Sequence, residues 1–402
     1  MITEIIVVGG GPCGSYTGLT ASKQNAKVII CEEHPEIGAP RHCAGHISLS
    51  GLKRLSLELP QKSIENEIRG AHFYSQSGEE LTIRTKKTVT YIINRELLDK
   101  YLAELAAKAG AEYLMGTKVR SFITNGDKVE GVIVEREGKT ETLRSKIVVD
   151  AEGAAATLLR RAHLPVSDRS QMVNSIQIDA ENIELEDEDM VEVYLTQKYA
   201  HGLFAWIIPK QKGKVRIGLA SKTGNVLENL KEFANNHPVA SKKLKKIQIT
   251  NPSFHLIPLG GIMPKTYHEG LLVVGDAASQ VKPTTGGGVI FGLTCAKIAG
   301  EIAAKAIASN DQAEGTLSEY QSKCKEAVGF DLTAMRMIRR KLDNMSDEKI
   351  ERAFKIWRRF DVPEALERVG DLDYQGRSLL KVAKSPKALL GVTYSFLTTL
   401  LS

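Results

Sequence analysis

A short stretch near the N-terminus gathers side chains that can transfer protons. It is a loop rich in proline and glycine, expected over residues 34–46, and it contains His42, Cys43 and His46. Thiols and imidazoles act as proton donors, and both are also zinc ligands. These three residues do not have a recognised zinc-ligand spacing, and no second cluster in the sequence completes a tetrahedral site. We therefore expect no metal here, and proton transfer is the candidate chemistry.

Upstream of this loop the sequence carries a phosphate-binding turn. The apolar run Ile5–Val8 predicts a buried parallel strand, and it leads into G-x-G-x-x-G with Gly9, Gly11 and Gly14. The first glycine permits a tight turn, the second lets the backbone approach a pyrophosphate, and the third lets a helix pack close to the strand. Glu32 ends the next expected strand, about twenty residues further on, where its carboxylate can bind a ribose. The combination predicts a dinucleotide site.

A second motif of this kind lies far downstream. A short strand expected over Gly270–Val274 leads into Gly275-Asp276-Ala277-Ala278, and a glycine-rich turn then opens a helix of small residues. Asp276 can accept hydrogen bonds from ribitol hydroxyls, and N–H groups of the turn can face the negative end of an isoalloxazine ring. The turn residues in question are Gly286, Gly287, Gly288 and Val289. Both motifs are therefore expected to contact one nucleotide cofactor.

The remaining sequence alternates between helical and strand-rich segments. Residues 67–90 alternate apolar and polar side chains as antiparallel strands do, and residues 171–220 are again rich in strands. A helix is expected from Asn94 to about Ala109. The strand-rich segments interrupt the dinucleotide-type pattern, so we expect an α/β protein with two domains and an extension.

Charge and cysteine usage narrow the function classes. The net charge is +6, and residues from Asp331 onward hold fourteen Lys and Arg against ten Asp and Glu. Nucleic-acid binding is not expected because no recognised module accompanies these charges. The five cysteines are widely spaced, the N-terminus enters a strand without a signal peptide, and no apolar run reaches about eighteen residues. These features predict a cytoplasmic protein.

Four local strings resemble the FAD-dependent p-hydroxybenzoate hydroxylase superfamily and, within it, the geranylgeranyl reductases, especially the archaeal enzymes acting on digeranylgeranylglycerophospholipids. They are GGGPCGS from Gly9, HPEIGAPRHCAGHIS from His34, FAWIIPK from Phe204 and GDAA…PTTGGG from Gly275. The resemblance implies a Rossmann-like FAD-binding domain, an inserted antiparallel-sheet substrate domain and a C-terminal helical extension. The expected boundaries are 1–66, 91–168 and 266–325 for the FAD-binding domain, 67–90 and 169–265 for the substrate domain, and 326–402 for the helical region.

The resemblance also implies residue roles. The FAD would be lined by the glycines of both turns and by Glu32, Cys43, Ala44, Arg95, Val119, Asp276 and Val289. The substrate tunnel would be lined by Phe204, Trp206 and Pro209. Two departures stand out. Glu152-Gly153 replaces the superfamily's Asp-Gly pair, and His42-Cys43-Ala44-Gly45-His46 replaces a segment that often reads Arg-Cys-Gly-Glu-Gly.

The implied reaction is the saturation of C=C bonds in geranylgeranyl chains, most directly in archaeal-type membrane phospholipid precursors. Reduced FAD would deliver a hydride to one carbon, and the protein would deliver a proton to the other. Cys43, His42 and His46 are the candidate proton donors. The implied partners are a prenylated lipid and an external electron donor, either NAD(P)H or a ferredoxin.

Other functions of flavoproteins remain open at this level. An aromatic monooxygenase has the same fold, and a flavin-dependent halogenase is suggested because Phe204–Pro209 approaches that family's W-x-W-x-I-P. The first tryptophan of that motif is a phenylalanine here, and the expected lysine loop is not apparent. An electron-transfer protein would be expected to carry an iron–sulfur cysteine run, which this sequence lacks. A non-catalytic binding protein would not need two separated FAD motifs.

The C-terminal tail has two interpretations. The segment Glu351–Arg359 is amphipathic and basic, and Lys381–Lys387 precedes a mostly apolar end. In one interpretation, basic residues meet anionic headgroups at the inner face of the membrane, while Leu389, Leu390, Tyr394, Phe396 and Leu397 enter the acyl boundary. In the other, a terminal helix docks on the core or caps the tunnel.

Overall fold

The computed structural model describes residues 2–40, 43–211, 213–245, 247–369, 371–382, 384–387 and 389–390. The chain forms two compact units. The first contains Met1–Arg41, Asn94–Gln171 and Pro258–Leu332, and the second contains His42–Ile93, Met172–Ile257 and Thr333–Ser402. The three-part division expected from the sequence is a different partition and stays a prediction.

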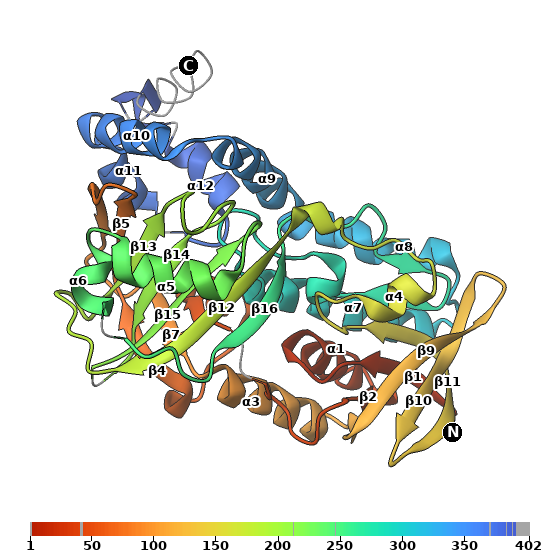
Figure 1. The fold of residues 1–402 in the computed structure, drawn as a ribbon. Helices are drawn as coiled ribbons and strands as arrows, with labels where there is room; N and C mark the ends of the chain where they lie inside the picture. The colour runs from red at the N-terminus through yellow and green to blue at the C-terminus, as the bar shows by residue number, and fades with distance from the viewer. Residues whose placement is uncertain are drawn as a thin grey trace. The chain divides into compact units, whose positions relative to one another are not determined.

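The first unit is built on an eight-stranded sheet (Figure 1). Its order is β17-β18-β11-β1-β2-β8, and β10 and β9 continue from β11 as an antiparallel hairpin. The strands are β1 (Ile2–Val8), β2 (Val28–Cys31), β8 (Glu112–Leu114), β9 (Thr117–Asn125), β10 (Lys128–Arg136), β11 (Lys139–Asp150), β17 (Tyr267–His268) and β18 (Leu271–Val273). β1 pairs in parallel with both β2 and β11, so the glycine turn follows the carboxyl end of a central strand.

The helices of the first unit pack around these strands. They are α1 (Pro12–Ser22), α3 (Arg95–Lys108), α4 (Thr157–Arg161), α7 (Val289–Ala308) and α8 (Glu314–Cys324), with short helical turns at Arg169–Gln171, Gly275–Ala278 and Lys325–Gly329. α1 packs against α3, α7 and the central strands. The helix expected from Asn94 is thus present as α3, and the helix of small residues expected after the second glycine-rich turn is present as α7.

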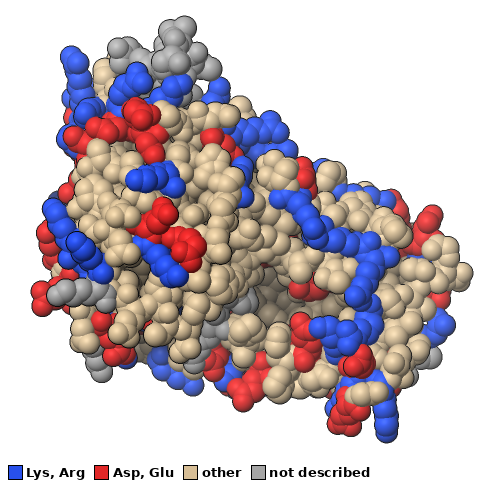
Figure 2. All heavy atoms as spheres, in the orientation of Figure 1, with Lys and Arg blue, Asp and Glu red and all other residues tan. Residues whose placement is uncertain are grey.

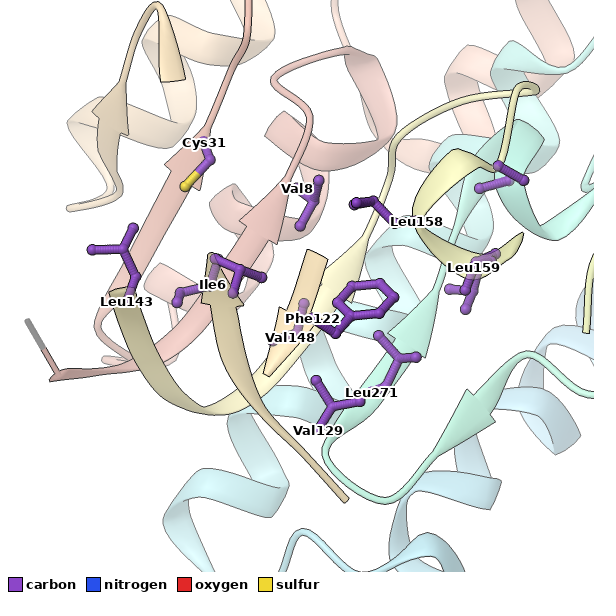
Figure 3. Packing of buried hydrophobic residues seen from close by; sticks show 14 of the residues in the cluster. Ile6, Val8, Cys31, Phe122, Val129, Leu143, Val148, Leu158, Leu159 and Leu271 are labelled. Atoms are coloured by element: carbon purple, nitrogen blue, oxygen red, sulfur yellow. The ribbon is translucent and has the colours of Figure 1, made fainter. Parts of the chain in front are cut away.

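Both faces of β1 are buried, which explains its run of branched apolar residues. Ile6 and Val8 join a cluster with Phe122 of β9 and Leu158 of α4 (Figure 3). Ile5 and Val7 alternate with them and therefore point to the opposite face, and all four side chains are buried. Burial of each such side chain contributes about 1.5–3 kcal/mol, so the central strand is firmly fixed.

The second unit contains a seven-stranded sheet with the order β16-β12-β15-β14-β13-β5-β6. A separate three-stranded sheet has the order β3-β7-β4. The strands are β3 (His46–Ser48), β4 (Ile64–Ile68), β5 (Gly70–Ser75), β6 (Glu80–Arg84), β7 (Thr90–Ile93), β12 (Met172–Glu181), β13 (Met190–Leu195), β14 (Ala205–Pro209), β15 (Lys214–Ser221) and β16 (Ser253–Pro258). The larger sheet departs from the expected antiparallel pattern at β13 and β5, which pair in parallel because they come from distant stretches of chain.

One face of the seven-stranded sheet is covered by α5 (Val226–Asn236) and α6 (Ala240–Leu244). Alternate residues of the strands, such as Ile176, Ile207 and Ile217, pack against Phe233 of α5 and Leu244 of α6. The residues between them on each strand lie on the opposite face. That face carries Trp206, whereas Pro209 has the alternation of Ala205 and Ile207 and lies on the helix-covered face.

The C-terminal region is helical, as expected, and is attached to the second unit. The helices of this region are α9 (Phe330–Asp343), α10 (Asp347–Arg359), α11 (Val362–Val369) and α12 (Gln375–Val382). The second unit also contains α2 (Leu49–Leu55). Ile350 and Phe354 of α10 pack on Leu81 of β6, with Phe73 beside them. Among the described residues, no helix is long and apolar enough to cross a bilayer.

The fold class expected from the sequence is confirmed: a mixed α/β protein with a Rossmann-like unit, a second sheet-based unit and C-terminal helices. On the face shown in Figure 2, Lys and Arg side chains lie interspersed with Asp and Glu. A mixed surface of this kind is typical of an ordinary solvated protein rather than of a track for a nucleic-acid backbone.

Candidate active site

Three glycines shape the turn after β1, each for a different reason. Gly9 has φ +95°, and a Cβ built on it would lie 2.6 Å from the Ala151 carbonyl oxygen. A Cβ on Gly14 would lie 1.9 Å from the Gly9 carbonyl oxygen, so only glycine lets α1 pack this close to the turn. A Cβ on Gly11 would meet no described atom within 4 Å. Gly11 therefore keeps an open space at the helix entrance, where a phosphate group can approach the backbone.

The N-terminus of α1 is suited to bind an anion. Gly11 is its N-cap, Pro12 occupies its first turn, and no described side chain caps it. The first N–H groups of a helix lack partners within the helix, and they carry the positive end of its dipole. A pyrophosphate placed beside Gly11 would satisfy them.

Glu32 is fixed at the mouth of this turn. Its carboxylate Oε2 accepts a hydrogen bond from the Gly10 N–H at 2.7 Å, and its Oε1 accepts one from the His34 N–H at 2.9 Å. His34 Nδ1 lies 2.6 Å from the same Oε1. Glu32 is only 8% exposed, so its orientation is well determined. The second lone pair of Oε2 remains suitable for a sugar hydroxyl.

Arg95, Asp99, Asp276 and Cys13 form one electrostatic group in the first unit. Arg95 donates through Nε and Nη2 to the Asp99 carboxylate at 3.1 Å. Burial raises the pKa of Asp99 above its usual value, against the opposing effect of Arg95. Burial also raises the pKa of Cys13 to about 12, with Asp276 contributing in the same direction. Cys13 is therefore a packing thiol, held between Gly275 and Gly292.

The second glycine turn opens α7 beside Asp276. Gly288 is the N-cap of α7. A Cβ on Gly288 would lie 3.0 Å from Asp276 Oδ1, so the carboxylate and the helix N-terminus share one small space. Gly286 has φ +72°, and its N–H binds the Lys282 carbonyl oxygen at 2.9 Å. The local sequence thus presents Asp276 and the N–H groups after Gly287 together, as a flavin site requires.

Two residues near the cofactor motifs have local roles that the sequence did not reveal. Glu152 accepts hydrogen bonds from the N–H groups of Leu158 at 2.9 Å and Leu159 at 3.2 Å, so its carboxylate caps α4. Val119 of β9 packs, partly buried, against the hydrophobic cluster beneath the sheet. The carboxylate of the Glu-Gly pair is thus occupied by a helix end in this structure.

In the second unit, Cys43, Ala44 and Gly45 form a loop, here called the Cys43 loop, that is tied down by the seven-stranded sheet. Gln177 Nε2 donates to the Cys43 carbonyl oxygen at 3.1 Å. Arg216 Nη1 donates to the Ala44 carbonyl oxygen at 3.0 Å and lies 3.4 Å from that of Cys43. Gly45 closes the loop at φ +73°, where a Cβ would lie 2.3 Å from the Ile93 carbonyl oxygen.

Arg216 is itself held by a network of charges. Its Nε and Nη2 donate to the two carboxylate oxygens of Asp179 at 2.7 and 3.0 Å, and Lys210 donates to Asp179 at 2.9 Å. Burial alone would raise the pKa of Asp179, but these hydrogen bonds keep it below its usual value. Lys210 and Arg216 also face Glu65, at 3.1 and 3.7 Å. The loop therefore rests on a preorganised ion cluster.

The two histidines of the proton-transfer cluster differ from Cys43. His46 is exposed at the start of β3, and its Nε2 lies 2.6 Å from Thr90 Oγ1. His42 lies outside the described residues. In the described part of the chain, no group of three His, Cys, Asp or Glu residues is arranged to hold a metal ion.

The expected substrate residues lie on β14 of the same unit. Trp206 is 8% exposed, and Phe204 contacts it edge-on with ring centroids 6.0 Å apart. A Cβ on Gly218, which lies opposite Trp206 on β15, would be 2.5 Å from the indole ring. The indole therefore packs directly against that glycine. Pro209 ends β14 and is buried.

Trp206 and the Cys43 loop occupy the same face of the sheet. Gln177, Gly218 and Trp206 lie opposite one another on the neighbouring strands β12, β15 and β14, so they form one row across the sheet. Gln177 binds the Cys43 carbonyl oxygen, and Gly218 supports the indole. The sequence analysis did not identify Gln177 or Arg216. The signal for Arg216 was a charged residue inside the apolar strand Val215–Leu219.

The expected residues thus divide between the two units. The first unit holds Gly9, Gly11, Gly14, Glu32, Arg95, Val119, Asp276, Gly286, Gly287, Gly288 and Val289. The second unit holds Cys43, Ala44, His46, Phe204, Trp206 and Pro209. The residues of the first unit have the geometry of a cofactor site. Those of the second unit combine a thiol with an aromatic surface.

Comparison with known proteins identifies the class of protein first. The model of the FAD binding domain family matches residues 2–329. The chain therefore belongs to this family, and FAD is its cofactor, as the two glycine turns allow.

Particular relatives then narrow the class. A digeranylgeranylglycerophospholipid reductase from Methanocaldococcus jannaschii is 34% identical over 352 residues, which cover 87% of this chain and 89% of the relative. The crystal structure of a geranylgeranyl bacteriochlorophyll reductase-like protein from Thermoplasma acidophilum superposes with a TM-score of 0.83 at 26% identity, covering 98% and 99% of the two chains. The chain belongs to this geranylgeranyl reductase family, and the resemblance in the four strings is confirmed.

The halogenase alternative has weaker support. The structure of the flavin-dependent brominase Bmp2 superposes with a TM-score of 0.67 at 17% identity, over 86% of this chain and 90% of the brominase. Likeness at this level of identity shows a shared fold alone.

Proposed function

We propose that this protein is an FAD-dependent reductase that saturates C=C bonds of geranylgeranyl chains in archaeal-type phospholipid precursors. Similarity to a reductase of that name over nearly the whole chain supports the family assignment. The structural observation that carries the proposal is the row Gln177–Gly218–Trp206, which sets the Cys43 loop beside an aromatic, apolar surface. Such a surface suits an isoprenoid chain, which gains about 0.8 kcal/mol for each buried methylene.

The first unit would hold the FAD. The N–H groups at Gly11 and the start of α1 would bind the pyrophosphate, Glu32 the ribose, and Asp276 with the start of α7 the flavin end. When reduced, the flavin supplies a hydride for one carbon of the double bond. An external donor must re-reduce it, and NAD(P)H and a ferredoxin are the two candidates.

The second unit would position the prenyl chain and supply the proton. Phe204 and Trp206 would hold the chain, whereas Pro209 would border the site only through the end of β14, since it lies on the other face of the sheet. The Cys43 thiol would protonate the carbon that does not receive the hydride, with Arg216 and Gln177 fixing the loop that carries it. His46 is the alternative donor in the described residues, but its exposed ring and its contact with Thr90 favour a structural role.

We also propose that the protein contacts the membrane surface at its C-terminal end. Leu380, Leu389 and Leu390 are 60%, 44% and 60% exposed, and exposed lysines stand between them at Lys381, Lys384 and Lys387. Exposed leucines beside lysines favour anionic phospholipid headgroups. The apolar side of α10, in contrast, packs on β6. Of the five apolar tail residues named earlier, Tyr394, Phe396 and Leu397 lie outside the described residues.

Vesicle binding tests the membrane proposal. The protein is expected to co-sediment with vesicles that contain phosphatidylglycerol and not with pure phosphatidylcholine vesicles. Leu380→Glu should weaken this binding, whereas Phe254→Ser, at an exposed phenylalanine on β16, should leave it unchanged. Equal binding of both variants would contradict the proposal.

An anaerobic single turnover tests the reaction. The flavin is reduced chemically, a geranylgeranylated phospholipid is added, and the lipid is analysed by mass spectrometry. We expect flavin reoxidation together with a gain of two hydrogens for each double bond reduced. NADPH and a reduced ferredoxin are then compared as reductants of the flavin. Reoxidation that requires oxygen and an aromatic compound, with every prenyl lipid unchanged, would overturn the proposal in favour of a monooxygenase.

A further inference from the structure

The C-terminal region makes a specific polar contact with the helix that follows the Cys43 loop. The turn Asp371–Tyr374, here called the C-terminal turn, lies against α2. Asp371 pairs with Arg54 at 2.7 Å and accepts a hydrogen bond from Ser50 Oγ at 3.2 Å. Asp373 accepts a hydrogen bond from Ser48 Oγ. These residues are more than three hundred positions apart in sequence, and all belong to the second unit.

The C-terminal turn is organised to present these two carboxylates. Asp371 Oδ1 also accepts hydrogen bonds from the backbone N–H groups of Asp373 and Tyr374, both at 3.2 Å. The guanidinium of Arg54 lies 4.0 Å above the centre of the Tyr374 ring. Asp373 is 2% exposed and Tyr374 5% exposed. A buried carboxylate is costly to place unless it is hydrogen-bonded, so this contact is specific.

The contact reaches the residue that starts α2. Ser48 is the N-cap of α2, and its hydroxyl oxygen accepts a hydrogen bond from the Gly51 N–H at 2.9 Å. The same hydroxyl donates a hydrogen bond to the Asp373 carboxylate. Ser48 ends β3, which begins at His46, directly after the Cys43 loop. Asp373 therefore fixes one end of a short, continuous segment whose other end carries the Cys43 thiol.

The Cys43 loop is thus anchored on both sides. Arg216 and Gln177 hold its carbonyl oxygens from the sheet, and the C-terminal turn holds the segment after it through Ser48. The family model that matches this chain ends at residue 329, so the C-terminal turn lies beyond the matched FAD-binding portion. The C-terminal region therefore has a structural connection to the proposed proton donor.

We infer that Asp371 and Asp373 are positioning residues, which set the orientation and accessibility of the Cys43 thiol through Ser48 and α2. The inference rests on the proposed role of Cys43 in the reductase. It assigns to the C-terminal region an indirect part in the chemistry, through the position of Cys43 and separate from any contact with a membrane.

The test measures Cys43 without any substrate. The FAD-loaded full chain is treated with iodoacetamide, and the modification of Cys43 is followed by peptide mass spectrometry. Asp373→Ala is expected to change the alkylation rate by about fivefold and to lower the kcat of prenyl reduction about tenfold, with KM little changed. Asp373→Asn keeps an acceptor for Ser48 and should stay within about twofold of the wild type.

Three further variants keep the test decisive. Asp361→Ala removes another C-terminal carboxylate, which pairs with Lys387, and should leave the alkylation rate unchanged. Where Asp373→Ala does not fold, Arg54→Ala and Asp371→Ala replace it, because each removes one side of the Arg54–Asp371 pair on α2 and keeps the Ser48–Asp373 hydrogen bond. Each should change the alkylation of Cys43 in the same direction.

A folded Asp373→Ala or Asp371→Ala variant with the wild-type alkylation rate would overturn the inference. Failure of the reductase proposal looks different, because the wild-type protein would then leave prenyl lipids unchanged while alkylation of Cys43 still responded to Asp373. Loss of activity with unchanged alkylation would show that the C-terminal turn acts elsewhere, and it would equally overturn the inference.

Discussion

The two candidate sites of this molecule are specified in opposite ways. The FAD site of the first unit is made mostly of backbone: glycines that allow close approach, at the N-termini of α1 and α7. The Cys43 site of the second unit is made of side chains. Arg216, Asp179 and Gln177 belong to strands far from Cys43 in sequence, and together they hold the Cys43 loop in place. A backbone site should fail when a single methyl group is added, and a side-chain site should fail when a charge is removed.

The largest effect is expected at Gly14. In the Gly14→Ala variant the added Cβ would lie 1.9 Å from the Gly9 carbonyl oxygen and 3.1 Å from the Gly9 carbonyl carbon, and neither backbone atom can move without opening the turn. We expect a loss of about 4 kcal/mol or more in the free energy of unfolding, together with loss of bound FAD. Chemical denaturation and the flavin absorbance of the purified protein measure both. A yellow variant of wild-type stability would contradict the geometry of the turn.

Removing Arg216 should break the other site and spare the first. In Arg216→Ala, Asp179 loses its bidentate partner and the Ala44 carbonyl oxygen loses its donor. Arg216 is buried but the Asp179 side chain is 49% exposed, so we expect a fall in stability of about 2 kcal/mol together with a strong loss of kcat. FAD affinity, measured by fluorescence titration, should remain at the wild-type value.

Arg216→Lys is the matched control for this prediction. Lysine keeps the positive charge but cannot bind Asp179 and the loop carbonyl oxygen at once, because it lacks the planar fork of arginine. Stability should be largely restored and kcat only partly. Full recovery of kcat in the lysine variant would show that charge alone, rather than the position of the Cys43 loop, is what the reaction needs.

The contrast between the sites also explains what the sequence could predict. The strand Ile5–Val8, the glycine turn and α7 follow from short motifs, because their physical cause lies within about fifteen neighbouring residues. The fold class, the family and the cofactor were predicted correctly on that basis. The assignment of individual cofactor and catalytic residues stays a prediction, although the geometry around Gly11 and Asp276 agrees with it.

The features that the sequence did not predict depend on contacts between segments that are far apart in the sequence. Arg216 touches Ala44 across 172 positions, and Asp373 touches Ser48 across 325. The parallel pairing of β13 with β5 is likewise a consequence of tertiary structure. No periodicity or spacing encodes such pairs, so a single sequence could not reveal them.

Gly11 gives a sharper test of the backbone site than Gly14. Because a Cβ on Gly11 meets no described atom within 4 Å, and because its φ of −64° suits any residue, Gly11→Ala should leave the stability of the FAD-free protein unchanged. The methyl group would instead occupy the space of the phosphate. We expect FAD affinity to fall about thirtyfold, which corresponds to about 2 kcal/mol.

Thermal unfolding of the FAD-free protein and FAD titration separate the two effects. A variant that is destabilised without FAD would show that Gly11 is needed by the chain itself. Unchanged affinity would place the phosphate elsewhere along the turn. Either result would contradict the prediction that Gly11 is needed for FAD binding alone, whereas Gly14 is needed for folding.

The smallest expected effect is on the pH dependence of stability. A buried group in each unit contributes to it, and the two contributions have opposite signs. His237, fully buried in the second unit, donates through Nε2 to the Ser75 carbonyl oxygen at 3.0 Å, and burial lowers its pKa to about 4. Below pH 6.5 the unfolded chain binds a proton that the folded chain does not, so stability is full above pH 6.5 and falls as the pH drops towards 4. In the first unit, burial and Glu152 raise the pKa of Asp150, so that group favours folding as the pH falls.

At pH 5.5 the His237 contribution should amount to a loss of about 1.4 kcal/mol relative to pH 7.5. The His237→Gln variant keeps a polar side chain that cannot titrate in this range, so its pH dependence between 7.5 and 5.5 should be flatter by that amount. Urea unfolding followed by the fluorescence of Trp206 and Trp357, both of which lie in the second unit, reports on the affected part. An identical slope in the wild type and the variant would mean that the buried imidazole is protonated in the folded state, and that the second unit tolerates a charge among Tyr194, Tyr199 and Phe233.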